Sequence, residues 1–182
     1  LIQKLPHRPR QVHRRRARCF HQADEVSAFL SVASGPRGQR HAHRPGDTEC
    51  RRAPDGQPLA KARGEHLDLH GVIRDGNGRA VDGAEIEIWQ CDAFGSYRHP
   101  RGAGDRIDAG FQGFGATRSD GRGGYRFRTI RPVPYPGRTP HIHVKLRHAS
   151  FGELTTQLFV AGEPRNARDS LWRSLRADDR AA

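Results

Sequence analysis

Two histidines, His141 and His143, stand two residues apart in a segment with the pattern of a β-strand. Side chains alternate along an extended chain, so both imidazoles lie on one side together with Lys145. The residues that point to the opposite, buried side are Ile142, Val144 and Leu146. Two imidazoles on one rigid strand are suited to binding a metal ion. A lone His-x-His pair is more often a solvated strand face, however, so the rest of the chain must supply further ligands.

The composition favours one β-rich domain. The 182 residues suffice for a single domain with a hydrophobic core, or for a smaller domain with tails. Frequent glycine and proline with few aromatic residues suit a loop-rich β architecture better than a helical bundle. The net charge of +12 is concentrated in residues 1–63, which hold 14 Lys/Arg and 5 Asp/Glu. The basic character therefore belongs to this leader and says little about the rest.

The cysteines and the hydropathy exclude several classes of protein. Cys19, Cys50 and Cys91 have no paired spacing, so they predict neither a disulfide framework nor a Cys-x-x-Cys metal site. A reducing compartment, and hence a cytoplasmic location, is expected. No run approaches the roughly 20 apolar residues that span a bilayer, so no membrane association is expected.

Residues 1–63 are predicted to form a poorly ordered basic leader. They show neither helical nor strand periodicity and contain few apolar side chains to offset the entropy of ordering. The arginines in residues 14–18 would suit a nucleic-acid-binding arm, but no aromatic residues interleave with them. No specific nucleic-acid partner is therefore predicted.

From Glu65 onward the pattern becomes that of short strands. Apolar and polar residues alternate in segments 67–73, 84–89, 125–129, 141–146 and 154–160, with turn sequences between them. The glycine-rich stretch 91–118 is predicted to be a long functional loop. Residues 169–176 predict a short helix capped by Asp169. The predicted fold class is all-β, a β-sandwich with long functional loops and a disordered N-terminal segment.

A set of motifs keeps a fixed order along the strands and loops. They are Ile88-Trp89-Gln90-Cys91-Asp92-Ala93, Gly95-Ser96-Tyr97, Phe111-Gln112-Gly113-Phe114-Gly115, Thr129-Ile130-Arg131-Pro132, Tyr135-Pro136-Gly137-Arg138 and Pro140-His141-Ile142-His143. Together they resemble the intradiol ring-cleavage dioxygenases, and within these the protocatechuate 3,4-dioxygenase type. The resemblance extends from about residue 65 to about residue 176.

The resemblance implies a non-haem Fe(III) site and names its residues. The implied metal ligands are Tyr97, Tyr135, His141 and His143. Tyr135 would also accept a substrate proton, Arg138 would stabilise negative charge near the reacting carbon, and Gln157 would line the same pocket. The implied substrate is a catechol such as protocatechuate, opened by dioxygen to a cis,cis-muconate by a protein that assembles into oligomers. Ferric iron favours anionic oxygen, so phenolate ligands also fit it on chemical grounds.

Both ends of the chain depart from the family pattern. Residues 1–63 lack the Thr-Glu-Gly-Pro-like motif that precedes the first strand in family members, and the family continues beyond the position of Ala182. One hypothesis covers both: the sequence is an incomplete or frame-shifted version whose native frame enters near residue 60. The predicted organisation is a basic leader over 1–63, out of frame on this hypothesis, and a C-terminally truncated dioxygenase-like sandwich over 64–182.

Two other interpretations stay open at this stage. Residues 71–84 also resemble prealbumin-like and carboxypeptidase-regulatory-like domains, which would make the chain a non-catalytic β-sandwich binding module. The basic leader alone would indicate a nucleic-acid binder. The four candidate ligands in family order favour the enzyme over both.

Several single residues have plainer interpretations. Trp89 and Phe127 are predicted to be core residues, and His99 a surface residue. Asp105 and Asp108 lack the full ligand set of a calcium loop. The sequence does not decide which cation would meet a ring carboxylate; the candidates are Arg131, Lys145 and Arg147.

Overall fold

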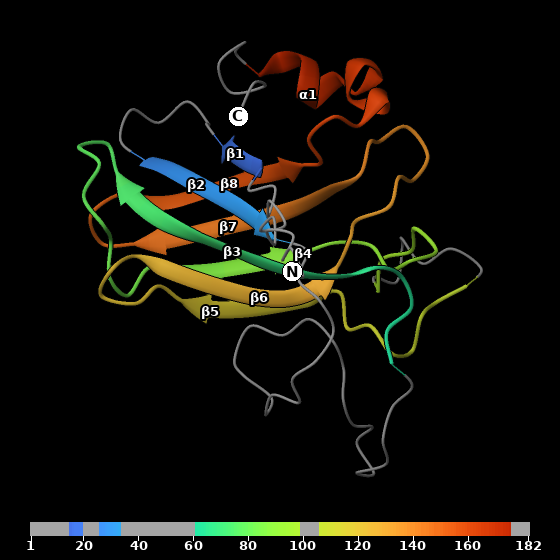
Figure 1. The fold of residues 1–182 in the computed structure, drawn as a ribbon, viewed down its shortest axis with the longest axis horizontal. Coiled ribbons are helices and arrows are strands. Elements are labelled where there is room, and N and C mark those ends of the chain that lie inside the picture. Colours follow the sequence, from blue (N-terminus) through green and yellow to red (C-terminus); the bar gives the residue numbers. More distant parts are fainter. Residues whose placement is uncertain (1–14, 20–25, 34–60, 99–105, 176–182) are drawn as a thin grey trace, which may run out of the picture.

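Two antiparallel sheets of four strands each pack face to face (Figure 1). This computed structural model describes residues 15–19, 26–33, 61–98 and 106–175, with side chains described from residue 61 onward. The first sheet has the order β1-β2-β3-β6, with bounds Arg15–Cys19, Val26–Ala33, His66–Asp75 and Gly124–Ile130. The second has the order β5-β4-β7-β8, with bounds Phe114–Arg118, Glu85–Trp89, His141–His148 and Gly152–Phe159.

Alternating apolar side chains from both sheets form the core. On the second sheet, Ile86 lies opposite Leu146 and Ile88 opposite Val144. On the first sheet, Leu69, Ile73 and Phe127 are buried against them. The predicted β-sandwich is therefore confirmed, and burial of these side chains is its main stabilising term.

The other side of the second sheet carries the polar residues of β7. In the strand register Trp89 lies opposite His143, Glu87 opposite Lys145 and Glu85 opposite Arg147. We call this side the outer face of β7. The predicted alternation holds along the strand, since Ile142, Val144 and Leu146 are buried in the core.

Two stretches predicted to lack strands contain them. Strands β1 and β2 lie within residues 1–63, and β2 pairs with β3 from Val26 opposite Asp75 to Ala33 opposite Asp68. Strand β5 lies within residues 91–118 and pairs with β4. Gly115 and Ala116 have low strand propensity, so the local sequence does not indicate β5; hydrogen bonding to the neighbouring strand favours the extended backbone instead.

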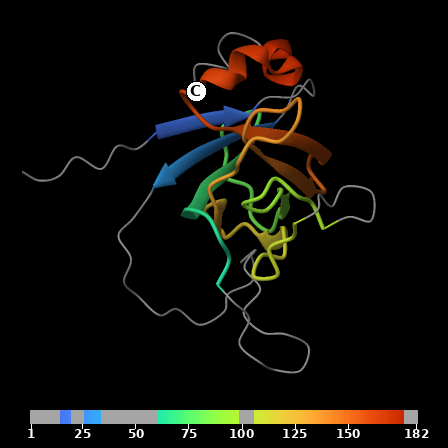
Figure 2. The same ribbon diagram turned by 90° about the vertical axis from the view of Figure 1, so that its right-hand side faces the viewer.

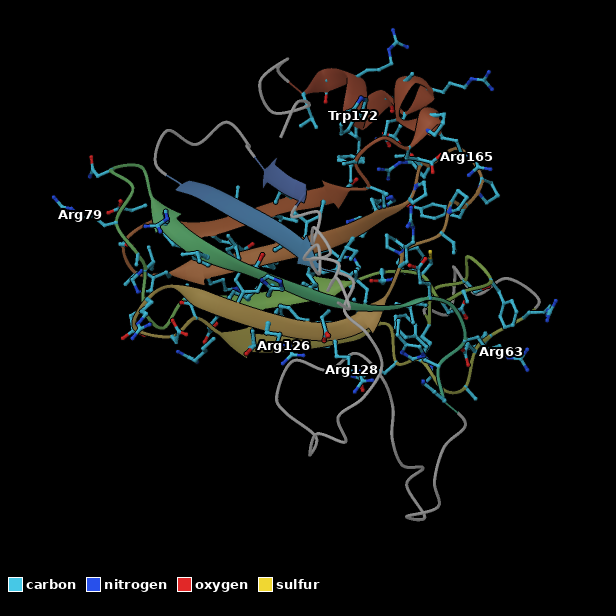
Figure 3. All side chains as sticks on the ribbon, in the orientation of Figure 1. Arg63, Arg79, Arg126, Arg128, Arg165 and Trp172 are labelled. Atoms are coloured by element: carbon cyan, nitrogen blue, oxygen red, sulfur yellow. The ribbon has the colours of Figure 1, made fainter. Side chains whose placement is uncertain are left out.

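The segment after β8 forms two short helical turns. Helix η1 spans Pro164–Arg168 and α1 spans Ser170–Ser174. The predicted cap is confirmed, because the Asp169 carboxylate accepts hydrogen bonds from the first amides of α1. Trp172, labelled in Figure 3, packs edge-on against Phe159 of β8, with ring centroids 5.3 Å apart. No helix in the described ranges is long and apolar enough to cross a membrane.

Two long loops emerge at one end of the sandwich. Strands β4 and β6 end there and β7 begins there, so the loop after Trp89 and the loop of residues 131–140 emerge side by side. Figure 2 looks onto this end, with the two loops in yellow-green and orange. The opposite end carries short turns, such as the one near Arg79 in Figure 3.

Candidate metal centre

His141 and His143 direct their imidazoles at one point on the outer face of β7. Their Nε2 atoms are 3.2 Å apart. His141 is 1% exposed, and its Nδ1 lies 2.7 Å from the carbonyl oxygen of Thr139. A carbonyl oxygen can only accept, so Nδ1 of the neutral ring carries the proton and Nε2 presents its lone pair. The backbone thus fixes the tautomer that a metal ion requires.

Both rings are neutral at neutral pH. The pKa of His143 is lowered to about 4, mainly by burial, and the neighbouring His141 and Arg138 contribute to the same shift. Burial also lowers the pKa of His141. Neutral imidazole is the ligating form, so metal binding at neutral pH displaces no proton from either ring.

Tyr135 reaches the histidines from the loop before β7. A tight turn joins it to Arg138, whose backbone N–H donates to the Tyr135 carbonyl at 2.9 Å. Gly137 has φ +78°, a backbone conformation that glycine adopts without strain. The Tyr135 hydroxyl oxygen lies 3.4 Å from His141 Nε2. The turn therefore places a phenol oxygen beside the two imidazoles.

Tyr97 arrives from the loop that follows β4. Its ring lies edge-on to Tyr135 and tilted to His143, with centroid separations of 5.6 and 6.3 Å. The buried Asp92 carboxylate shapes this loop by accepting backbone N–H donors from Phe94 at 2.9 Å and Ser96 at 3.0 Å. Two loops and one strand thus bring together all four residues predicted as ligands.

The Tyr97 hydroxyl is buried and makes no hydrogen bond within the described part of the chain. Burial raises the pKa of this phenol above its ordinary range, and the nearby Tyr135 adds to the effect. A buried hydroxyl with no partner is unfavourable, which indicates that a missing partner completes this site. A bound cation would be such a partner, since it lowers the pKa of a coordinating phenol.

The spacing of the donors fits one metal ion. Two nitrogen ligands at about 2.1 Å from an ion and at right angles to each other lie about 3 Å apart. The separation of the two Nε2 atoms is 3.2 Å. No group of three or more His, Cys, Asp or Glu in the described ranges could hold a metal. Any metal here would depend on the phenol oxygens, which suit a hard, highly charged ion.

Arg138 and Gln157, predicted as catalytic residues, lie beside the four candidate ligands. Arg138 donates from Nη2 to Gln157 Oε1 at 2.5 Å and from Nη1 to the Tyr135 hydroxyl oxygen at 3.4 Å. Gln157 lies opposite His143 in the register of β7 and β8. A fixed cation is therefore held at the edge of the site.

Two residues near the site were not predicted to act there. Trp89 was predicted to be a core residue, but it is half-buried on the outer face and stacks on His143, with ring centroids 4.8 Å apart and planes 1° apart. The register that pairs Trp89 with His143 puts both rings on one face. Asp169 was predicted only as a helix cap, and it also binds Arg138 at 2.8 Å. Phe127 lies in the core as predicted.

The remaining candidates have other partners or positions. Lys145 and Arg147, farther along β7, form ion pairs with Glu153 of β8. Arg131 Nη1 lies 3.7 Å from the Glu65 carboxylate. The buried Asp108 carboxylate accepts hydrogen bonds from the backbone N–H groups of Arg63 and Gly110, so it stabilises the local backbone. His99 and Asp105 lie outside the described residues.

Comparison with known proteins identifies the family. A family model described as "Dioxygenase" matches residues 34–180. The chain is 36% identical over 127 residues to the protocatechuate 3,4-dioxygenase beta chain of Burkholderia cepacia, covering 65% of this chain and 52% of that one. It is 34% identical over 122 residues to the catechol 1,2-dioxygenase of Acinetobacter baylyi, covering 56% of this chain and 38% of that one.

A solved structure shares the fold. The dioxygenase domain of a dioxygenase and carbohydrate-binding fusion from Streptomyces sp. SirexAA-E superimposes with a TM-score of 0.55 at 30% identity, covering 76% of this chain and 78% of that one. The chain belongs to the intradiol dioxygenase family. It spans about half, or less, of the length of these two relatives of known sequence.

Proposed function

We propose that the chain binds non-haem Fe(III) through Tyr97, Tyr135, His141 and His143 and catalyses intradiol cleavage of a catechol by dioxygen. The observation that carries this proposal is that two imidazoles and two tyrosine rings lie in mutual contact, with the two Nε2 atoms 3.2 Å apart and the Tyr97 hydroxyl buried and without a hydrogen bond in the described part of the chain. When bound, Fe(III) supplies a Lewis-acid centre for the two catechol oxygens.

The residues of the chain supply proton transfer and charge stabilisation. The Tyr135 phenolate oxygen is positioned to take a proton from a catechol hydroxyl, since it lies at the edge of the site next to Arg138. The Arg138 guanidinium then stabilises negative charge that develops on the ring. The Gln157 Oε1 atom on β8 accepts a hydrogen bond from Arg138 Nη2, so it contacts that cation from the neighbouring strand.

Stacked and buried aromatic rings limit the access of water to the ligands. Trp89 covers one face of His143, and Phe159 lies 6.1 Å from the ring of His141. Lower polarity strengthens the attraction between the Arg138 cation and developing negative charge.

The proposed substrate is protocatechuate or a close relative. A protocatechuate 3,4-dioxygenase beta chain and catechol 1,2- and hydroxyquinol 1,2-dioxygenases are among the similar proteins. The second candidate function is a non-catalytic binding module with a related sandwich fold. We also propose that the protein is cytoplasmic and forms oligomers.

Colour and oxygen uptake test the proposal together. Loading the protein with Fe(III) is expected to produce a burgundy tyrosinate-to-iron absorption band, and an oxygen electrode is expected to record uptake with protocatechuate, catechol or hydroxyquinol. A colourless iron-treated protein would overturn the metal site and favour the binding module. A coloured protein without oxygen uptake would keep the metal site and overturn the catalytic part.

A further inference from the structure

Asp169 lies at the junction between the last helix and the site. Its side chain is fully buried, with 0% exposure. One carboxylate oxygen accepts the backbone N–H groups of Leu171 and Trp172, each at 3.0 Å. The other accepts Arg138 Nε at 2.8 Å and the Thr139 N–H at 3.1 Å. One carboxylate therefore joins α1 to the loop that leads into β7.

The contact with Asp169 sets the direction of the Arg138 guanidinium. The group is planar and rigid, so holding Nε on one side directs the two terminal nitrogens to the other. Those nitrogens contact the Tyr135 hydroxyl and Gln157. Asp169 is the carboxylate that the structure pairs with Arg138, and a free arginine side chain would lose this orientation through its rotatable bonds.

The same terminal segment also holds the backbone next to His141. Thr139 Oγ1 donates to Asn166 Oδ1 at 2.7 Å, and Asn166 Nδ2 donates to the Val160 carbonyl at 2.9 Å. The Thr139 carbonyl in turn accepts from His141 Nδ1. The residues after β8 therefore fix the position of Thr139, and Thr139 fixes the imidazole.

We propose that Asp169 is a positioning residue for the reaction, acting through Arg138. This positioning role rests on the function proposed above, and it belongs to a residue that contacts none of the four candidate metal ligands. Its role as helix cap is separable, because Ser also caps helices but is too short to reach Arg138. Asp169→Ser therefore keeps the cap and removes the contacts of the second carboxylate oxygen with Arg138 and the Thr139 N–H. Asp169→Asn keeps the side-chain size and removes the charge.

A double-mutant cycle in the iron-loaded protein tests this. D169N and D169S are each expected to keep the absorption band and to lower kcat by about 10- to 100-fold. The double variant R138Q/D169N is expected to be no slower than R138Q, since the proposal has Asp169 affecting kcat through Arg138. Losses that multiply, or an unchanged kcat in both Asp169 variants, would overturn the proposal.

A matched variant separates this role from general damage to the segment. Glu163 caps η1 by accepting the Arg165 N–H at 3.2 Å, six residues before Asp169. E163Q makes the same carboxylate-to-amide change and is expected to leave kcat unchanged. A loss of kcat in E163Q equal to that in D169N would assign the effect to the segment as a whole and overturn the specific role of Asp169.

A measurement on the metal-free protein does not depend on activity. The Arg138 Nε–H signal in a nitrogen-15 NMR spectrum is identified as the one missing in R138Q. It is expected to exchange slowly with solvent in the parent protein and rapidly in D169N and D169S. Slow exchange in all three would overturn the proposal. An inactive, colourless parent with the expected NMR change would overturn the proposed function and keep the positioning of Arg138.

Discussion

The outer face of β7 carries two kinds of polar chemistry within eight residues. Its first half presents His141 and His143 to the loops, and we call this the covered half. Its second half presents Lys145 and Arg147, which form ion pairs at 2.9 Å with Glu153 of β8. We call this the open half, since the Arg147 side chain is 41% exposed.

The difference between the halves lies in what covers them. The loops of Tyr97 and Tyr135 lie over the histidines, and burial lowers the pKa of His143 to about 4. Solvent reaches the ion pairs of the open half, so their charges persist. Strand alternation thus selects which residues share a face, whereas the covering loops decide whether the polar groups of that face are buried and neutral or stay charged in exposed ion pairs.

Removing the Tyr97 oxygen is expected to have the largest effect on the covered half. Y97F is expected to lose iron binding, the visible band and oxygen uptake together. The metal-free variant is expected to be more stable than the parent by about 1 kcal/mol, because a buried hydroxyl without a partner is unfavourable. Visible absorption and urea unfolding measure the two effects.

The third tyrosine provides the control for that experiment. Tyr125 lies in the sandwich core, so Y125F removes the same atom away from the site. It should retain the band. A coloured Y97F, or a metal-free Y97F that is less stable than the parent, would contradict the assignment of Tyr97.

Arg138 tests charge stabilisation within the covered half. R138Q is expected to keep the iron band and to lower kcat by about 100-fold, as for the loss of one preorganised group that stabilises developing charge. Steady-state oxygen uptake gives kcat and KM. An R138Q variant with parental kcat would show that the cation does not assist the reaction.

Trp89 tests the support of a ligand by its neighbour. W89L removes the ring stacked on His143 and is expected to weaken iron affinity by about tenfold, because the imidazole gains freedom. Competition with a chelator measures the affinity. F127L, a comparable change in the core, should lower the melting temperature without changing the affinity.

Acidification should distinguish the two halves in the metal-free protein. The pKa of His143 in the folded protein lies below the ordinary histidine value of 6.5, so the unfolded state binds more protons between about pH 6.5 and 4. Stability therefore falls as the pH falls through that window. The Lys145 and Arg147 side chains lower the pKa of Glu153 below 4.5, so its contribution is lost at still lower pH.

Melting curves against pH check this order. H143N should flatten the profile between pH 6.5 and 4, and E153Q should flatten it only below pH 4.5. The effect of E153Q should be the smaller and should fade in high salt, because exposed ion pairs are weak and screened. Equal effects of the two variants in the upper window would contradict the comparison.

Much of the fold and of the candidate site could be predicted from the sequence, because these features depend on local patterns or on the order of motifs. The alternation around Ile142 and Val144 predicted the buried face of β7, and Asp169 was recognised as a cap three residues before Trp172. These signals act over one to four residues. The order of the motifs likewise pointed to the four residues that the structure brings together.

The features that could not be predicted from the sequence depend on contacts between residues far apart along the chain. Asp169 reaches Arg138 across 31 positions, and Trp89 stacks on His143 only because of the register between β4 and β7. Strand β5 forms in a glycine-rich stretch because β4 pairs with it. Each depends on tertiary packing, which local propensity does not encode.

The two tryptophans lie where they can report on the site. Trp89 stacks on His143, and Trp172 contacts Phe159, whose ring faces His141. The chain contains no other tryptophan. A bound paramagnetic ion with visible absorption would quench the fluorescence of both tryptophan side chains. The intrinsic fluorescence of the unlabelled protein should therefore measure how much metal is bound.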